Sequence, residues 1–374
     1  MNSFGGCSSD AFLEKKEDAK KVIERCRRRE GFYASTQHYQ ELWLRDLVYS
    51  EDVLLKLGYS KDVENHLSEF MRLQRDNGQM PTVIDFSLSK LIRQRYQSCP
   101  SDTEILFVIG MCKLGQSAGN PFFRDNEKAV KSCVAFVESK LNEHKLVPGM
   151  DWRDTMPGYK GKFLLANQML LADMYELLGN LAASNLVKEN VNEFFYSKEH
   201  GYYADTVYWK GSALKQDHNF DSLGNALAII NGTASEKVSE AIAKGFTAAK
   251  TPFGYRNITP DYGFNRAKLL ARWYFMCHVA NGAFLRNKAG MYQNSSIWPF
   301  VEIRVIEALR KLQAKGEAEA AIKLLIERPG LMSSTIRELG SQEVVRGSFG
   351  RLQLWFLRLI FAGLTAGSVV RKRA

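Results

Sequence analysis

The segment FLLANQMLLADMYELLG, residues 163–179, decides the fold class because its apolar residues lie on more than one side of a helix. It ends at Gly179, the residue type that most often follows the last turn of a helix. A helix that is apolar around most of its circumference needs neighbours on both sides. An inner ring of helices wrapped by an outer ring provides such neighbours. This segment therefore favours a double ring of helical hairpins.

Helical patterns continue along most of the chain. Ser101 and Glu104 form a capping-box pattern ahead of ILFVIGMCKLG, residues 105–115. Alternating strand patterns are scarce, and residues 193–209 are the only convincing hairpin candidate. No Pro-rich or Ser-rich linker divides the chain. We therefore predict an all-α protein in which residues 1–374 form one closed helical domain.

The composition excludes several classes of protein. The chain of 374 residues is 45% hydrophobic and 25% charged, which is typical of a globular protein. Its six cysteines form no CxxC pair, and its six histidines show no ligand spacing. We therefore expect reduced thiols and no metal site. No GxxxxGK[ST], strand-associated GxGxxG or GxSxG element is present, so the sequence predicts no cofactor and no serine hydrolase.

The formal charge of +10 raises the question of nucleic-acid binding. Only residues 25–29 and 371–374 form basic clusters, and we interpret both as solvated helix ends. The apolar run at 354–370 contains Arg358 and is shorter than the roughly 20 residues that span a bilayer, so we expect a buried terminal helix there. The first residues show no secretory pattern. We therefore predict a cytoplasmic protein with neither a nucleic-acid partner nor a membrane partner.

The chemically distinctive residues gather in six short loops, each just ahead of an apolar helix. These loops are HYQELWLRD (38–46), GQMPTVID (78–85), GMDWRDTMPGYKGK (149–162), DHNFDSLGN (217–225), YQNSSIWPF (292–300) and IRELGSQEVVRG (336–347). In a ring of hairpins, the loops that lead into the inner helices all open at one end. Aromatic, acidic and Arg side chains that converge there suit a sugar, because rings stack on a pyranose and charged groups bind its hydroxyls.

The same loops resemble segments of known sugar-cleaving enzymes. YQELWLRDLVYS (39–50) resembles the W-x-R-D segment of glucoamylases and amylo-α-1,6-glucosidases, and residues 151–171 are similar to a debranching-enzyme stretch that runs from W-M-D-A to an N-A-L helix. Residues 292–309 are similar to the Y-x-N-G-x-x-W-P element, also found in processing α-glucosidases. Residues 220–234 resemble a helix of neutral invertases, and 336–364 resemble a segment in which a catalytic Glu precedes a Q-x-W helix.

This resemblance implies an (α/α)6 barrel and an inverting glycoside hydrolase that acts on an α-glucoside in carbohydrate metabolism. Two departures stand out. Asn294-Ser295 replaces the usual Asn-Gly pair, and Leu339-Gly340 replaces the aromatic and acidic residues that usually follow Glu338.

The resemblance also implies roles for individual residues. An inverting enzyme needs one protonated carboxyl and one carboxylate, roughly 6.5–9.5 Å apart. Asp154 takes the position of the general acid, and Asp151 takes it if a trehalase-like S-G-W-D match is the right one. Glu338 takes the position of the general base, with Glu343 as the alternative. The expected substrate-binding residues are Tyr39, Trp43, Arg45, Asp46, Asp151, Trp152, Arg153, Asn219, Asp221, Gln293 and Trp298.

Three other functions stay open at this point. A sugar epimerase on the same barrel would use histidine pairs, and His38 and His218 lie in candidate loops. A non-catalytic glycan-binding barrel would fit the weaker match around Glu338. A nucleic-acid binder would need a continuous basic face, which the spread of Lys and Arg does not provide. The linkage, the aglycone and the oligomeric state are left open by the sequence.

Overall fold

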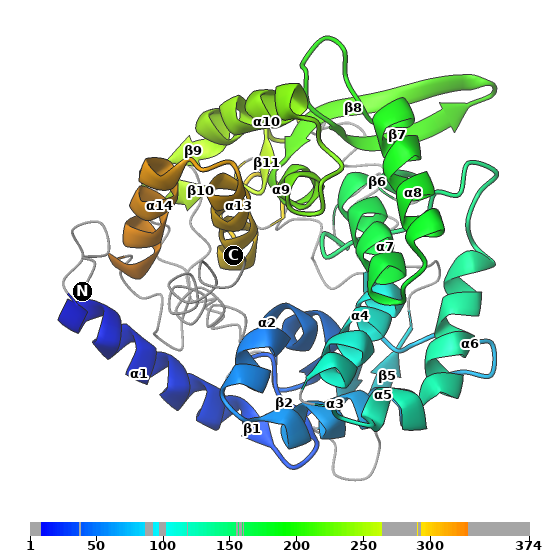
Figure 1. Cartoon of the computed structure of the whole chain (residues 1–374), viewed down its shortest axis with the longest axis vertical. Coiled ribbons are helices and arrows are strands. Elements are labelled where there is room, and N and C mark those ends of the chain that lie inside the picture. The colour runs from blue at the N-terminus through cyan, green and yellow to red at the C-terminus, as the bar shows by residue number, and fades with distance from the viewer. Residues whose placement is uncertain are drawn as a thin grey trace, which may run out of the picture.

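The computed structural model describes residues 9–36, 39–86, 93–96, 102–117, 119–154, 156, 159, 161–263, 290 and 293–327. Within these ranges the chain forms two concentric rings of helices (Figure 1). Five helices of the described part lie side by side in the inner ring. They are α2 (Leu44–Lys56), α4 (Asp102–Gln116), α7 (Leu165–Leu177), α9 (Ser222–Ile230) and α13 (Pro299–Lys311).

The outer helices each follow an inner helix and pack against it. The inner–outer pairs that are in contact are α2 with α3 (Ser60–Arg72), α4 with α6 (Glu127–Glu138), α7 with α8 (Leu181–Phe194), α9 with α10 (Glu236–Ala249) and α13 with α14 (Lys315–Glu327). The N-terminal helix α1 (Ser9–Cys26) lies on the rim, and α5 (Phe122–Asp125) is a single short turn (Figure 1). The predicted double ring of helical hairpins is therefore present.

Burial explains why α7 belongs to the inner ring and α8 to the outer ring. In α7 all residues from Leu165 to Ala172 are buried, so this helix has neighbours on every side. In α8 only Ser184, Val187 and Val191 are buried, a spacing that places one stripe against the core. The segment that indicated the fold class in the sequence is thus an enclosed helix of the inner ring.

The all-α prediction is wrong in part, because several small sheets accompany the helices. The largest has four antiparallel strands in the order β11-β8-β7-β6, formed by β6 (Phe163–Leu164), β7 (Ala204–Lys210), β8 (Ala213–Asp221) and β11 (Ile258–Thr259). A second sheet joins β3 (Leu42–Trp43), β4 (Val83–Asp85) and β5 (Arg93–Arg95). Two pairs of short strands complete the set, β1 (Arg27–Arg28) with β2 (Gly31–Phe32) and β9 (Lys250–Thr251) with β10 (Gly254–Tyr255).

The hairpin itself lies later in the chain than the predicted range of 193–209. Glu193 and Phe194 form the last turn of α8, and the hairpin strands β7 and β8 extend to Asp221. The turn falls at Gly211, whose φ of 64° lies in the left-handed region that a two-residue hairpin turn requires. The polar residues of β8 conceal its strand character in the sequence.

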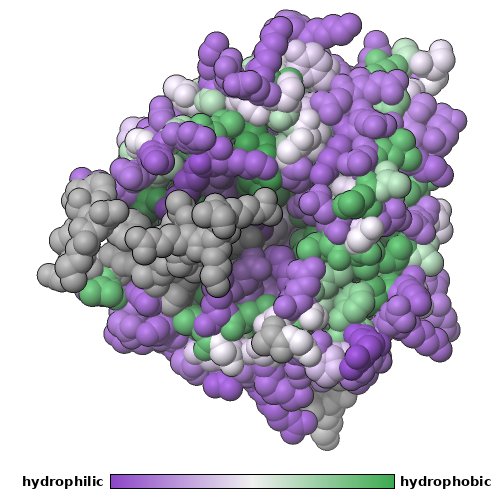
Figure 2. All heavy atoms as spheres, viewed as in Figure 1, coloured by the Kyte–Doolittle hydropathy of each residue, from purple (hydrophilic) through white to green (hydrophobic). Residues whose placement is uncertain are grey.

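The surface seen in Figure 2 is mainly hydrophilic and is hollowed near its centre. No helix in the described part of the chain is long and apolar enough to cross a membrane. The apolar run at 354–370, expected as a buried terminal helix, lies outside the described residues. Among the cysteines that the structure describes, Cys26, Cys112 and Cys133 are buried free thiols.

Candidate functional site

The beginnings of the five described inner helices are joined by side-chain contacts around the loop 149–154. Arg45 lies in the first turn of α2, and Asp102 is the first residue of α4. The loop itself leads towards β6 and α7. Asp221 caps the N-terminus of α9 through a bond from the backbone N–H of Leu223, and Trp298 takes the N-cap position of α13. Described residues from four of the six polar loops that the sequence singled out, 38–46, 149–162, 217–225 and 292–300, therefore meet at one end of the ring, and loop 336–347 lies outside the described residues.

Arg45 connects two carboxylates of this site. Its Nε donates to both oxygens of Asp102 at 2.9 and 2.8 Å, and its Nη2 donates to Asp102 Oδ1 at 2.7 Å. Its Nη1 donates to Asp154 Oδ2 at 2.9 Å. Burial alone would lower the pKa of Arg45, but Asp102 and Asp154 raise it above its ordinary value. The guanidinium is therefore a fixed positive charge between the two carboxyl groups.

The two carboxyl groups on Arg45 differ in exposure. The side chain of Asp102 is fully buried, whereas 25% of the side chain of Asp154 is exposed. Burial raises the pKa of Asp102 to about 6, although Arg45 acts in the opposite direction. Asp102 is thus an anchor for Arg45, and Asp154 is the carboxylate of the pair that a bound molecule can reach.

The loop that carries Asp154 is held through three successive backbone carbonyls. The carbonyl of Met150 accepts from Asn167 Nδ2 at 3.3 Å, and that of Asp151 accepts from Arg45 Nη2 at 3.0 Å. The carbonyl of Trp152 accepts from Gln293 Nε2 at 2.7 Å. The same Gln293 nitrogen lies 3.4 Å from Asp154 Oδ1. Side chains from three different parts of the ring therefore fix this loop just ahead of Asp154.

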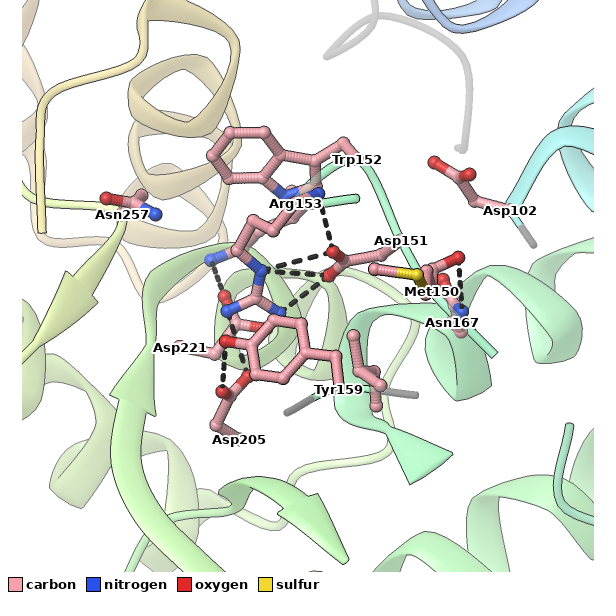
Figure 3. Close-up of polar contacts among 12 residues, drawn as sticks. Asp102, Met150, Asp151, Trp152, Arg153, Tyr159, Asn167, Asp205, Asp221 and Asn257 are labelled. Carbon is pink, nitrogen blue, oxygen red and sulfur yellow. Dashed lines mark hydrogen bonds and ion pairs between the residues drawn. The ribbon is translucent and has the colours of Figure 1, made fainter. Parts of the chain in front are cut away.

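On the other side of the loop, Arg153 lies in a buried cluster of three carboxylates (Figure 3). Its Nη2 donates to Asp151 Oδ2 at 2.6 Å and to Asp221 Oδ2 at 3.3 Å. Its Nη1 lies 2.9 Å from Asp205 Oδ1, in an ion pair without the geometry of a hydrogen bond. Arg153, Asp205 and Asp221 are fully buried, and Asp151 is 1% exposed. We call these four residues the Arg153 cluster.

Two tyrosines complete the surroundings of Asp205. The hydroxyl groups of Tyr159 and Tyr262 both donate to Asp205 Oδ2, at 2.7 and 2.5 Å. Burial raises the pKa of Asp205, and it raises that of Asp221 to about 7, in each case against the opposing charge of Arg153. With three carboxyl groups around one guanidinium, protonation of one of them relieves the excess of negative charge.

The predicted aromatic walls fall into two separate groups. Trp152 and Trp298 contact each other with ring centroids 5.0 Å apart, and Trp152 also contacts Phe300 at 4.9 Å. Trp43 instead contacts Tyr39 at 5.9 Å, and both of these rings are half-buried. Trp152 and Trp298 are each only 6% exposed, so they form packed support beneath the loop rather than an open stacking face.

The structure places the remaining predicted site residues as follows. Asp46 is buried in the first turn of α2, where its carbonyl accepts from the hydroxyl of Ser50. Asn219 is half-buried on β8 and donates to the carbonyl of Pro260 at 2.8 Å. Glu338 and Glu343, the candidate bases, lie outside the described residues, as does His38.

Sequence reasoning missed Asp102, Asp205, Tyr159 and Tyr262. Asp102 had a usable signal, because it is an acidic residue at the start of a strongly apolar helix, like Asp46 and Asp221. Tyr159 lies within the loop 149–162 that the sequence singled out, whereas Asp205 and Tyr262 had no such signal, because only the folded chain brings them to this loop. Among the described residues, no group of three or more His, Cys, Asp or Glu side chains is arranged to hold a metal ion.

Comparison with solved structures identifies the fold. A GH63 mannosylglycerate hydrolase from Thermus thermophilus, in complex with glucose, matches 93% of this chain and 99% of its own, with a TM-score of 0.65 and 13% identity. A rhamnosidase from Klebsiella oxytoca with rhamnose bound matches 97% of this chain and 65% of its own, with a TM-score of 0.61 and 12% identity. A GH78 family rhamnosidase of Bacillus sp. GL1 matches 97% and 35%, with a TM-score of 0.66 and 14% identity.

These neighbours have the fold of (α/α)6-barrel glycosidases. The chain has the same fold. The expected (α/α)6 barrel is therefore confirmed, with the sheets described above as an addition. The chain spans less than two thirds of the length of either rhamnosidase. No family model and no curated protein sequence matches it.

Proposed function

We propose that this protein is an inverting glycoside hydrolase that acts on an α-glucoside, with Asp154 as general acid and Glu338 as general base. The observation that carries the proposal is the pair of carboxyl groups on Arg45. One of them, on Asp102, is buried as an anchor, and the other, on Asp154, is partly exposed at the converging ends of the inner helices.

The fold supports the same conclusion. Structures with this barrel are named as hydrolases of glycosides, and some of them hold a sugar, such as glucose in the mannosylglycerate hydrolase and rhamnose in the Klebsiella oxytoca rhamnosidase. The motifs of this chain resemble those of glucoamylases, amylo-α-1,6-glucosidases and processing α-glucosidases, which favours an α-glucoside over the rhamnoside or mannosylglycerate of the structural neighbours.

In the proposed reaction Asp154 donates a proton to the departing oxygen, and Glu338 removes a proton from the attacking water. Arg45 orients the Asp154 carboxyl through its 2.9 Å contact, while Asp102 holds Arg45 in place. Gln293 holds the same loop through the carbonyl of Trp152. Asp151, the alternative acid, has both oxygens bound by Arg153, so its contacts favour a structural role.

The epimerase alternative has less support. In the described part of the chain, Arg45 and Asp154 bind each other, Asp102 also binds Arg45, and Gln293 also binds Asp154. Within that part, no histidine is among them. His218, a candidate for proton transfer at carbon, instead contacts His200 with ring centroids 5.1 Å apart.

The test is a panel of glycosides incubated with the full chain, with the released sugar followed by NMR. Because an inverting enzyme delivers water to the face opposite the leaving group, we expect the β-anomer of glucose from an α-glucoside. Initial release of the α-anomer would contradict the inverting mechanism. Absence of release from every glycoside would contradict the hydrolase proposal.

A further inference from the structure

The Arg153 cluster joins the loop 149–154 to the four-stranded sheet. Asp205 lies on β7, and Asp221 lies at the end of β8, where it also caps α9. The pairing of Ala204 with Phe220 brings their neighbours Asp205 and Asp221 to the same end of the hairpin, where the strand register shifts between Ala204 and Thr206. Both carboxylates can therefore reach one guanidinium, and the side chain of Arg153 fills the space between them (Figure 3).

Arg153 and Asp154 are adjacent in the chain but bind different partners. Arg153 binds the three buried carboxylates, whereas Asp154 binds Arg45 and Gln293. The backbone carbonyl of Arg153 accepts from the N–H of Met156 at 2.9 Å, which forms a turn around Asp154. Because the three carboxylates hold the side chain of Arg153, they also fix the backbone of this short turn. The directions in which the side chain of Asp154 can point are therefore restricted.

The composition of the cluster indicates that it serves geometry rather than stability. Taking charged groups out of water is costly, and well-packed apolar side chains often replace a buried ion pair at no loss of stability. A cluster with three carboxylates and one guanidinium is especially costly, because the negative charges repel one another. The directions of its contacts are nevertheless specific, since each nitrogen of the Arg153 guanidinium lies against a defined carboxylate.

We propose that Arg153 is a positioning residue for Asp154, and that Asp205 and Asp221 give it a rigid support on the β7–β8 hairpin. The proposal rests on the proposed function in one respect, the role of Asp154 as the proton donor. It extends that function by giving the four-stranded sheet a role in catalysis. No described residue of this sheet directly contacts Arg45 or Asp154.

The test uses the variant Asp205→Asn with aryl α-glucosides whose leaving groups differ in basicity. The amide keeps an oxygen for Tyr159 and Tyr262 but removes the charge 2.9 Å from Arg153 Nη1. If Asp154 then points away from the leaving oxygen, protonation becomes inefficient. We expect kcat/KM to fall about 10- to 100-fold for the most basic leaving groups and to change little for the most acidic ones. Loss of packing alone would lower all rates equally.

Asp217→Asn is the matched control. Asp217 is also a carboxylate on β8, but it binds Lys162 and the hydroxyl of Thr206 and does not contact Arg153. We expect this variant to keep the dependence on leaving-group basicity of the parent protein. Tyr262→Phe, which removes one of the two hydroxyl bonds to Asp205, is a milder change that should shift the dependence in the same direction as Asp205→Asn.

A crystal structure of Asp205→Asn separates this proposal from the proposed function. We expect the contact of 2.9 Å between Arg45 and Asp154 to be lost or lengthened in the variant. An unchanged contact would overturn the positioning role, whether or not the chain hydrolyses a glycoside. A displaced Asp154 in a chain that cleaves no glycoside would support the positioning role and contradict the hydrolase proposal alone.

Discussion

Arg45 binds Asp102 and Asp154 at the same time, with the Nε edge of its guanidinium on the buried carboxylate and Nη1 on the exposed one. Asp102 is the first residue of α4, Arg45 lies in the first turn of α2, and Asp154 lies in the loop ahead of β6 and α7. Three neighbouring hairpins of the barrel are thus connected through one side chain. Any change at Asp102 should therefore be transmitted to Asp154.

We predict that Asp102→Asn lowers the free energy of unfolding by about 3–5 kcal/mol, because it removes one partner of a buried ion pair. The amide also turns a donor group towards the donors of Arg45. Urea denaturation of the variant and the parent protein measures the difference. Asp52→Asn is the control, since Asp52 pairs with Lys113 at 3.2 Å and is 28% exposed. It should cost at most about 1 kcal/mol. Equal small losses in both variants would contradict the anchor role of Asp102.

The raised pKa of Asp221 predicts a specific pH dependence of stability. Its pKa is about 7 in the folded protein and 3.8 in a free side chain, so the folded state binds this proton more tightly. The contribution to stability is therefore complete below about pH 4 and is lost as the pH rises to about 7. We therefore expect the free energy of unfolding of the parent protein, minus that of Asp221→Asn, to decrease as the pH rises across this range. An advantage that grows with pH would show that Asp221 is ionised in the folded state.

The double ring and the convergence of the loops were predictable, because both follow from patterns along the chain. The segment 163–179 has apolar residues on more than one side of the helix, which requires a place in the inner ring. Polar loops that lead into inner helices lie at the same end of the ring. The role of Arg153 was not predictable in the same way. In the sequence it is one Arg in DWRD, and only the pairing of β7 with β8 brings Asp205 and Asp221 against it. The strand β8 was itself concealed by its polar residues.

Ser295 departs from the motif at a position where the backbone conformation favours glycine. The resembling segments have Gly after the Asn, and Ser295 adopts a φ of 69°, in the left-handed region that favours glycine. We predict that Ser295→Gly raises the free energy of unfolding by up to about 1 kcal/mol. The relief of strain is about 1–2 kcal/mol, and the added freedom of the unfolded chain offsets about 0.5–1 kcal/mol of it.

The control for this change is Ser296→Gly at the next position. Ser296 is also buried, but its φ is not positive, so a glycine there gains no relief. It should lower the free energy of unfolding by about 0.5–1 kcal/mol. Thermal or urea denaturation of the two variants compares them directly. A loss of stability in Ser295→Gly would mean that the serine side chain contributes more than the strain costs.

Asp151 and Asp154 are the two candidates for the general acid, and their variants distinguish them. Asp154→Asn keeps the size of the side chain and one oxygen that can accept from Arg45, but it cannot protonate a departing alkoxide. We expect a severe loss of kcat/KM for a glucoside with a sugar leaving group. The loss should be milder for α-glucosyl fluoride, because fluoride departs without protonation. Glu338→Gln should damage both substrates alike, because it removes the group that activates water.

The structure makes Asp151→Asn a sharp comparison for Asp154→Asn. Asp151 is 1% exposed and accepts from the backbone N–H, Nε and Nη2 of Arg153, so its neutralisation should cost about 3–5 kcal/mol of stability. Asp154 is 25% exposed, and its replacement should cost at most about 1 kcal/mol. Denaturation and leaving-group kinetics on the same two variants therefore assign the roles. If Asp151→Asn folds and loses much less activity on α-glucosyl fluoride than on a glucoside with a sugar leaving group, and Asp154→Asn shows no such difference, then Asp151 is the acid. That outcome would favour the trehalase-like match.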